Sequence, residues 1–273
     1  MTIEITTAVP YAEISGFRPL ELDLYRPGPG DWPVVMYLHG GGWQRGSRRS
    51  VSPTLAGLDP PLFQRVVEAG IAVVSVDYRL SGEARYPAQL EDVNAAATWL
   101  TAEGPARGVD PSRLVLWGDS AGGHLAAMAA LTWPTDHPPP RGVVLWYAPT
   151  DLVGLEADAE ATGGESHAGA DSREGRLLGG PIEDRLELAT AASPLRHVSG
   201  GAPPFLLVHG TTDRAVPHPQ SERFVGALID AGNEAELLSI EGAGHMWAEA
   251  TGEQLEDIVA RTTAFLARHT QSS

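Results

Sequence analysis

Residues 114–125 read LVLWGDSAGGHL, an apolar strand that runs into a G-x-S-x-G motif and then into a helix-like segment. Such a sharp turn from strand to helix forces one side chain into a strained backbone position, and Gly118 and Gly122 remove Cβ atoms that would otherwise collide there. The helix that follows adds free N–H groups and a partial positive charge, which favour negative charge beside the turn. The stretch therefore predicts Ser120 as an exposed nucleophile at the end of a sheet.

A second glycine-rich motif, HGGGW at residues 39–43, directly follows another apolar strand. Consecutive glycines let backbone N–H groups turn inward and approach an oxygen closely, as the stabilisation of an oxyanion requires. We predict an oxyanion hole formed by the N–H groups of Gly41, Gly42 and Ala121. On its own the glycine run also fits a flexible turn, but its place upstream of the nucleophile favours the oxyanion hole. His39 is interpreted as a hydrogen-bonding brace for this loop.

A serine nucleophile needs a general base, and in a sheet of this kind the acid and the histidine follow later strands. The sequence FLLVHGTTD at residues 205–213 places Asp213 just beyond an apolar strand, and EGAGH at residues 241–245 does the same for His245. We predict that Asp213 fixes the imidazole tautomer in which the other nitrogen takes the Ser120 proton.

The acid assignment has two rivals. Asp151 and Glu241 also lie near the ends of expected strands, and Asp213 itself fits a plain loop or cap residue.

Strand-like and helix-like segments alternate along the chain. The expected buried strands are short and apolar, at residues 33–38, 71–76, 114–117, 143–147, 204–208 and 235–240. The expected helices have apolar residues at three- and four-residue spacing, at residues 62–69, 88–102, 124–131, 221–231 and 254–268. The alternation predicts an α/β fold in which helices cover both faces of a mostly parallel sheet, with an antiparallel edge formed by residues 3–15 and 21–25.

One segment departs from this alternation. Residues 152–201 are rich in Gly, Ala, Asp and Glu and fall between two core strands, so we expect a short cap or insert rather than a domain boundary. Whether it covers a ligand or only apolar surface stays open. Residues 1–273 are expected to form a single domain, because 42% hydrophobic residues suffice for one sizeable core.

Charge and composition exclude several other kinds of protein. The formal net charge of −16 repels a phosphate backbone or an anionic membrane, so we expect no nucleic acid and no membrane partner. Neither a signal-peptide pattern nor an apolar run of about 18 residues occurs, which predicts a soluble, cytoplasmic protein. No two histidines lie three or four residues apart and no nucleotide-binding glycine motif is present, so we expect no metal and no cofactor.

Together these motifs resemble the esterase and lipase branch of the α/β-hydrolases, and in particular the BD-FAE family, named for bifunctional feruloyl and acetyl-xylan esterases. The resemblance covers roughly residues 15 to 268 and includes the stretches DYRLSGEA (77–84), YPAQLEDV (86–93), ASP (192–194) and QSE (220–222). It implies a single α/β-hydrolase domain without a cofactor, which hydrolyses carboxylic esters through an acyl-enzyme on Ser120.

The resemblance leaves the substrate open, because related sequences act on acetylated sugars, feruloyl esters and simple aliphatic esters. Small soluble esters fit better than intact xylan, since no secretion signal is evident. Trp43, Tyr147 and Trp247 lie near the motif residues, where bulky rings predict a narrow substrate site for short acyl groups, although each ring also fits core packing. Two alternatives stay open, an arylformamidase-like amide hydrolase and a non-catalytic ligand receptor. A homodimer is compatible with the sequence.

Overall fold

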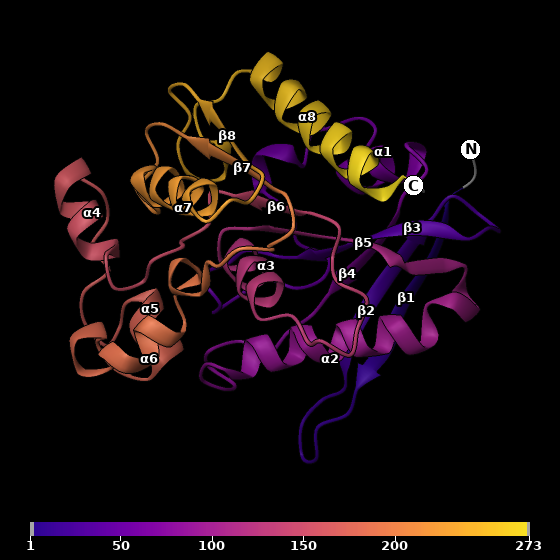
Figure 1. The fold of residues 1–273 in the computed structure, drawn as a ribbon, viewed down its shortest axis with the longest axis horizontal. Helices are drawn as coiled ribbons and strands as arrows, with labels where there is room; N and C mark the ends of the chain where they lie inside the picture. The colour runs from indigo at the N-terminus through magenta and orange to yellow at the C-terminus, as the bar shows by residue number, and fades with distance from the viewer. Residues whose placement is uncertain (1–2, 272–273) are drawn as a thin grey trace.

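A computed structural model describes residues 3–271, and its centre is one eight-stranded sheet (Figure 1). The strand order is β1-β2-β4-β3-β5-β6-β7-β8. β2 pairs antiparallel with both β1 and β4, and all other neighbours pair in parallel. The strands are β1 (Glu4–Ala12), β2 (Leu20–Arg26), β3 (Trp32–Leu38), β4 (Ala72–Val76), β5 (Val109–Asp119), β6 (Val143–Trp146), β7 (Phe205–Gly210) and β8 (Ala235–Ile240).

The predicted α/β architecture is confirmed, including the antiparallel edge formed by β1 and β2. The largest difference in a strand is at β5, which begins at Val109 instead of residue 114. Its first two residues pair with the start of β3, and a register shift follows before the apolar part. Hydrophobicity could not reveal this start, because residues 110–113 read DPSR. The sequence predicts a single domain over residues 1–273. Of these, residues 1–2 and 272–273 lie outside the described part of the chain.

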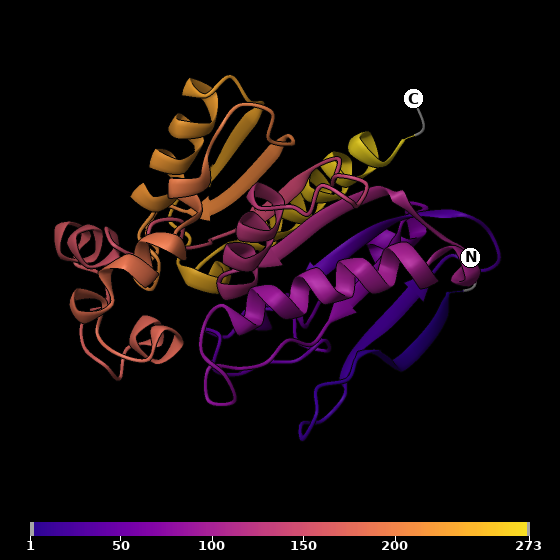
Figure 2. The ribbon, with the colours of Figure 1, turned by 60° about the horizontal axis from the view of Figure 1, so that its bottom comes forward.

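Helices cover both faces of the sheet, as Figures 1 and 2 show. The sheet has one hydrophobic core on each face. Successive side chains of a strand point to opposite faces, so Val34 of β3 packs in one core and Val35 packs in the other. The helices of one face are α2 (Ala88–Glu103), α3 (Ala121–Leu131) and α7 (Pro219–Asp230), and those of the other are α1 (Leu62–Glu68) and α8 (Gly252–Thr270).

The helix after the nucleophile motif begins earlier than expected. α3 begins at Ala121, immediately after Ser120, instead of at His124. Gly122 and Gly123 are poor helix formers, so the spacing of apolar residues placed the start beyond them. The earlier start puts the free N–H groups of the first helical turn directly beside the serine.

The insert between β6 and β7 forms three short α-helices, α4 (Leu155–Thr162), α5 (Arg173–Leu178) and α6 (Leu186–Ala191), and two 3-10 helices, Ile182–Asp184 and Pro194–His197. Figures 1 and 2 show them gathered at one end of the molecule, next to α7. Helices of six to eight residues are too short to produce a clear apolar period, which explains why residues 152–201 show no helical pattern in the sequence.

Candidate active site

The loops that carry the predicted site residues leave one edge of the sheet. β3, β5, β7 and β8 run parallel, so their carboxyl ends lie at the same edge. The HGGGW loop follows β3 and Ser120 follows β5, while Asp213 and His245 lie shortly after β7 and β8. The topology therefore brings together residues that are far apart in the sequence.

Ser120 occupies the sharp turn predicted between strand and helix. Its backbone angles are φ 51° and ψ −118°, a conformation that residues other than glycine rarely adopt. A Cβ atom on Gly118 would collide with the backbone of Gly122, and one on Gly122 would collide with the backbone of Leu38. The predicted reason for both glycines, steric room for the turn, is thus confirmed.

Ser120, His245 and Asp213 form one chain of hydrogen bonds. Ser120 Oγ lies 3.1 Å from His245 Nε2, and His245 Nδ1 lies 2.7 Å from Asp213 Oδ2. Because a carboxylate can only accept, the His245 proton lies on Nδ1 and the Nε2 lone pair faces the serine hydroxyl. This arrangement is one that activates a serine hydroxyl as a nucleophile.

The Asp213 carboxylate is buried among hydrogen-bond donors. Oδ1 accepts the N–H groups of Ala215 (2.8 Å) and Val216 (2.9 Å), and Oδ2 lies 3.2 Å from His209 Nε2. Burial alone would raise the pKa of Asp213, but hydrogen bonds from His209 and His245 outweigh it and hold the pKa well below its usual range. Asp213 is therefore ionised.

His209 has no role in the sequence-based prediction, yet it contacts the Asp213 carboxylate directly. It is fully buried, and its Nε2 faces two acceptors, Asp213 Oδ2 and the Val216 carbonyl oxygen (2.9 Å). This nitrogen therefore carries the proton, and the Ser221 hydroxyl, 2.7 Å from Nδ1, donates to the ring. The available signal was its position, four residues before Asp213 at the end of the same strand.

The two rival acids lie elsewhere. The oxygens of Asp151 are 3.6 Å from Arg196 and 3.7 Å from Arg223, while Glu241 is exposed. Among the described residues, the carboxylate that hydrogen-bonds to His245 is that of Asp213.

The HGGGW loop is held in a backbone conformation that requires glycine. Gly41 has φ +116° and Gly42 has φ +61°. A Cβ atom on Gly41 would collide with the backbone of Arg45, and one on Gly42 would collide with Arg173 of α5. Within residues 3–271, the N–H groups of Gly41, Gly42 and Ala121 donate no hydrogen bond to the protein, so they are available to an external oxygen.

Asp119 joins this loop to the nucleophile strand. Its Oδ1 accepts the Tyr37 hydroxyl (2.6 Å) and the Gly40 N–H (2.8 Å). Burial raises the pKa of Asp119, and these two hydrogen bonds oppose the rise. Because Asp119 precedes Ser120, the loop and the nucleophile are held in a fixed relation to each other.

His39 contacts the loop from below. Its ring stacks on Tyr78, with ring centroids 4.3 Å apart, and its Nδ1 lies 2.7 Å from the Gly40 carbonyl oxygen. Burial lowers the pKa of His39 to about 4, so the ring is neutral and Nδ1 donates to the carbonyl. These contacts fit the expected role of a brace.

The three aromatic residues expected at the substrate site are packed inside the protein. Trp43 and Trp247 are 1% exposed and Tyr147 is 0% exposed. Tyr147 packs edge-on against both His245 and Trp247, with ring centroids 4.7 and 4.6 Å apart. Trp43 packs edge-on against His124 at 5.1 Å. Their burial favours the core-packing alternative, because a side chain without exposed surface cannot line an open substrate pocket.

Within residues 3–271, no group of three or more His, Asp or Glu side chains is arranged to hold a metal ion. None of the helices in this part of the chain combines the length and the apolar character needed to cross a membrane.

The strand order, the helices on both faces and the strained serine between β5 and α3 define the α/β-hydrolase fold. A family model for BD-FAE matches residues 22–228, which is most of the chain. The protein therefore belongs to the BD-FAE family, and the resemblance inferred from its motifs is confirmed.

Named relatives and a solved structure agree with this assignment. Carboxylesterase NlhH of Mycobacterium tuberculosis is 33% identical over 239 residues, covering 82% of this chain and 72% of the relative. Esterase LipQ of the same organism is 32% identical over 240 residues, covering 83% of this chain and 53% of LipQ. The chain spans about half the length of the first curated relatives it matches. A truncated carbohydrate esterase from gut microbiota has a TM-score of 0.79 at 25% identity, covering 98% of this chain and 97% of that one.

Proposed function

We propose that this protein is a serine carboxylesterase with Ser120 as nucleophile, His245 as general base and acid, and Asp213 as the residue that orients His245. The observation that carries the proposal is the hydrogen-bond chain from Ser120 Oγ to His245 (3.1 Å) and on to Asp213 (2.7 Å). The similarity to an esterase and a carboxylesterase supports the reaction class.

In the acylation step, Ser120 Oγ attacks the ester carbonyl carbon and its proton passes to His245 Nε2. The carbonyl electrons move to the oxygen, which accepts hydrogen bonds from the N–H groups of Gly41, Gly42 and Ala121. When the C–O bond to the alcohol breaks, His245 returns the proton to the leaving oxygen. Water then repeats these steps on the acyl-enzyme and releases the acid and free Ser120. The low pKa of Asp213 keeps it ionised throughout.

We further propose that residues 152–201 form a cap on a single α/β-hydrolase domain. Two contacts support this role: Arg173 of the insert lies against Gly42, and the Leu177 carbonyl oxygen accepts the Tyr86 N–H at 3.0 Å. The insert therefore touches the loop that would hold the oxyanion. The cytoplasmic location and a homodimer stay predictions from the sequence.

The proposed substrates are small soluble carboxylic esters. The carbohydrate esterase with a similar structure and the carboxylesterase relative both support an ester. A preference for short acyl groups stays a prediction, and the buried rings of Trp43, Tyr147 and Trp247 do not support it.

The decisive measurement is kcat/KM for p-nitrophenyl esters from acetyl to dodecanoyl, with N-formylkynurenine and an acetylated xylo-oligosaccharide in the same series. Ser120→Ala protein serves as the blank. We expect rapid turnover of short esters by the native protein and a loss of about 10⁶-fold in the blank. Activity confined to the formamide would move the protein to the amide hydrolases.

A serine-directed organophosphonate tests the receptor alternative. We expect one label per chain, on Ser120, detected by mass spectrometry of the digested protein. Folded protein that takes up no label would contradict the esterase proposal and support a ligand receptor.

A further inference from the structure

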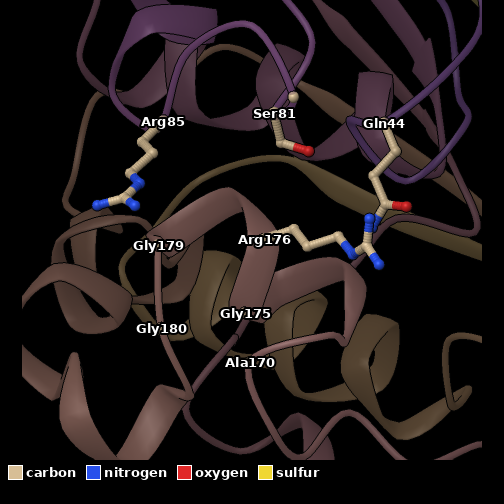
Figure 3. A pocket seen from close by; sticks show the side chains of 9 residues that line it. Gln44, Ser81, Arg85, Ala170, Gly175, Arg176, Gly179 and Gly180 are labelled. Atoms are coloured by element: carbon tan, nitrogen blue, oxygen red, sulfur yellow. The ribbon is translucent and has the colours of Figure 1, made fainter.

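A cavity of about 460 Å³ lies between the loop that continues from HGGGW and the insert. This volume falls within the range of small-molecule sites. Figure 3 shows its walls, with Arg85, Ser81 and Gln44 on one side and α5 on the other. The lining residues are Gln44, Ser81, Gly82, Arg85, Ala170, Gly175, Arg176, Gly179 and Gly180.

The lining is cationic although the whole chain carries a net charge of −16. It contains two arginines and no acidic residue. Among the described residues, Arg85 forms no ion pair, and Arg176 pairs at 3.4 Å with Asp171, whose side chain is 98% exposed. A third guanidinium lies nearby, because Arg185 Nη2 donates to the Gly179 carbonyl oxygen at 3.4 Å. The positive charge of this cavity is therefore poorly neutralised by the protein itself.

The side chains lie where a ligand could reach them. The Arg85 guanidinium lies against Gly179, where even a Cβ atom would collide with it. Across the cavity, the Arg176 side chain extends toward the wall that carries Gln44 (Figure 3). The Ser81 hydroxyl oxygen, by contrast, is buried in the wall and has no hydrogen-bond partner among the described residues. The cavity thus offers a ligand two guanidinium groups and an amide.

One wall of the cavity contains Gln44, the residue that follows the proposed oxyanion loop. The Gln44 N–H donates to the Gly41 carbonyl oxygen at 3.1 Å, and the Ser81 N–H donates to the Trp43 carbonyl oxygen at 2.7 Å. On the opposite wall, α5 supplies Arg176 to the cavity and Arg173 to the surface of Gly42. The cavity therefore lies next to the segment that continues from the loop proposed to hold the oxyanion.

We propose that this cavity binds a carboxylate carried by the ester substrate, at the end remote from the reacting carbonyl. The inference rests on the proposed esterase function and names a substrate class for it. This class comprises half-esters of dicarboxylic acids and hydroxy acids that are acylated on the hydroxyl group, both of which keep a free carboxylate. Guanidinium groups suit this ligand, because they present several N–H donors in a plane that matches a carboxylate. Contacts with a remote group also improve turnover by orienting the ester.

The test compares anionic esters with neutral esters of equal chain length. Monomethyl adipate and monomethyl suberate are measured against methyl hexanoate and methyl octanoate, and 6-acetoxyhexanoate against hexyl acetate, by pH-stat titration. We expect a higher kcat/KM for the anionic member of at least one pair. The ratio of anionic to neutral kcat/KM should fall about fivefold in Arg85→Gln and in Arg176→Gln protein, the effect of one partly exposed ion pair.

Arg268→Gln is the matched control, since it removes the same charge near the C-terminal end of α8, which lies away from the insert (Figure 1). We expect no change of the ratio in this variant. A ratio near one for every native pair, or an equal fall in the control, would overturn the proposal.

The neutral esters separate this test from that of the proposed function. If no ester is hydrolysed, the esterase proposal fails. A binding measurement then still tests whether the cavity holds a carboxylate. Calorimetric titration of Ser120→Ala protein with monomethyl adipate should then give measurable binding that weakens about fivefold with Arg85→Gln in the same protein. Absence of binding would overturn the proposal of a carboxylate site.

Discussion

The edge of the sheet that carries Ser120, Asp213 and His245, called the triad edge below, adjoins the insert, but the two regions are held by different forces. Ser120 is 8% exposed and Asp213 4% exposed, and both are fixed by backbone geometry and by the hydrogen bonds that link them through His245. The ion pair between Arg173 and Glu165 of the insert is more open, since its side chains are 32% and 59% exposed. Buried contacts thus fix the reacting groups, whereas the insert beside the HGGGW loop is held in part by an ion pair that lies in solvent.

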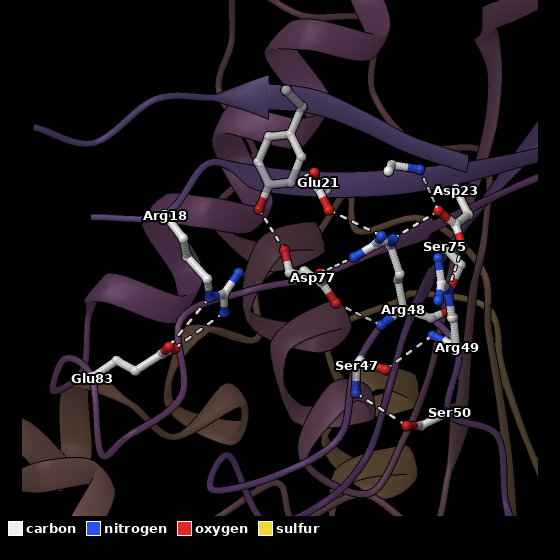
Figure 4. Close-up of polar contacts among 12 residues, drawn as sticks. Arg18, Glu21, Asp23, Ser47, Arg48, Arg49, Ser50, Ser75, Asp77 and Glu83 are labelled. Carbon is white, nitrogen blue, oxygen red and sulfur yellow. Dashed lines mark hydrogen bonds and ion pairs between the residues drawn. The ribbon is translucent and has the colours of Figure 1, made fainter. Parts of the chain in front are cut away.

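The network of ion pairs behind the HGGGW loop belongs with the triad edge in this comparison. Arg48 reaches from the loop to the strands and pairs with Asp23 at 2.7 Å and with Asp77, and its side chain is only 11% exposed. Figure 4 shows this guanidinium between the carboxylates, together with Glu21 at 3.0 Å. The segment that follows the HGGGW loop is therefore anchored through Arg48 to β2 and to Asp77 at the end of β4, by contacts that do not involve the insert.

Asp213→Asn removes the negative charge that orients His245. We expect kcat on p-nitrophenyl acetate to fall about 10⁴-fold, because an amide stabilises the wrong imidazole tautomer. Asp151→Asn is the matched control, since Asp151 is a buried carboxylate that does not contact His245, and it should lose less than about tenfold. Equal losses in both variants would show that the acid has been assigned wrongly.

Glycine substitutions compare the two regions in stability. Gly122→Ala would drive a methyl group into the backbone of Leu38, so we expect a loss of about 3 kcal/mol or more in unfolding free energy. Gly163→Ala, at the end of α4, meets no atom within 4 Å and is strained only by its φ of +68°. Its cost should be about 1 kcal/mol. Urea unfolding of both variants measures the difference, and equal costs would contradict it.

His209→Gln tests a contact that the sequence did not reveal. We expect kcat to fall about tenfold, because the Asp213 carboxylate loses the hydrogen bond that His209 donates and His245 is held less firmly. Ser221→Ala is the milder companion, since it removes only the partner of the other ring nitrogen. If His209→Gln leaves kcat unchanged and only lowers the melting temperature, His209 serves stability alone.

The sheet and the meeting of Ser120, His245 and Asp213 could be predicted because each depends on a local signal. Apolar runs of four to seven residues mark β3, β6 and β7, and the strained turn at Ser120 demands glycines at fixed positions. The chain order of serine, acid and histidine then assigned Asp213 and His245. The strands before these residues are parallel, so their carboxyl ends lie at one edge of the sheet. The meeting of the three residues can therefore be predicted from the fold class without knowledge of individual contacts.

The parts that could not be predicted depend on contacts between distant segments. Asp119 acts through buried partners that no spacing rule connects with it, and for His209 the signal was only its place four residues before Asp213. Trp43 and Tyr147 lie near the motifs in sequence, yet packing turns both rings into the core. The cavity beside the insert arises only where residues 44, 81–85 and 170–180 meet.

Glu165→Gln gives the most sensitive test of the difference between the two regions. It breaks the ion pair to Arg173, 2.7 Å in length and largely solvated, so the loss of unfolding free energy should be about 0.2–1 kcal/mol. Turnover of neutral short esters should change less than twofold, since Arg173 keeps its packing against Gly42 without a charged partner. Urea unfolding and kcat/KM are measured on the same preparation, with the exposed ion pair of Arg261 and Asp257 on α8, broken by Asp257→Asn, as the matched control. A tenfold loss of turnover confined to Glu165→Gln would mean that the insert fixes the oxyanion loop, and the two regions would then have to be regarded as one unit.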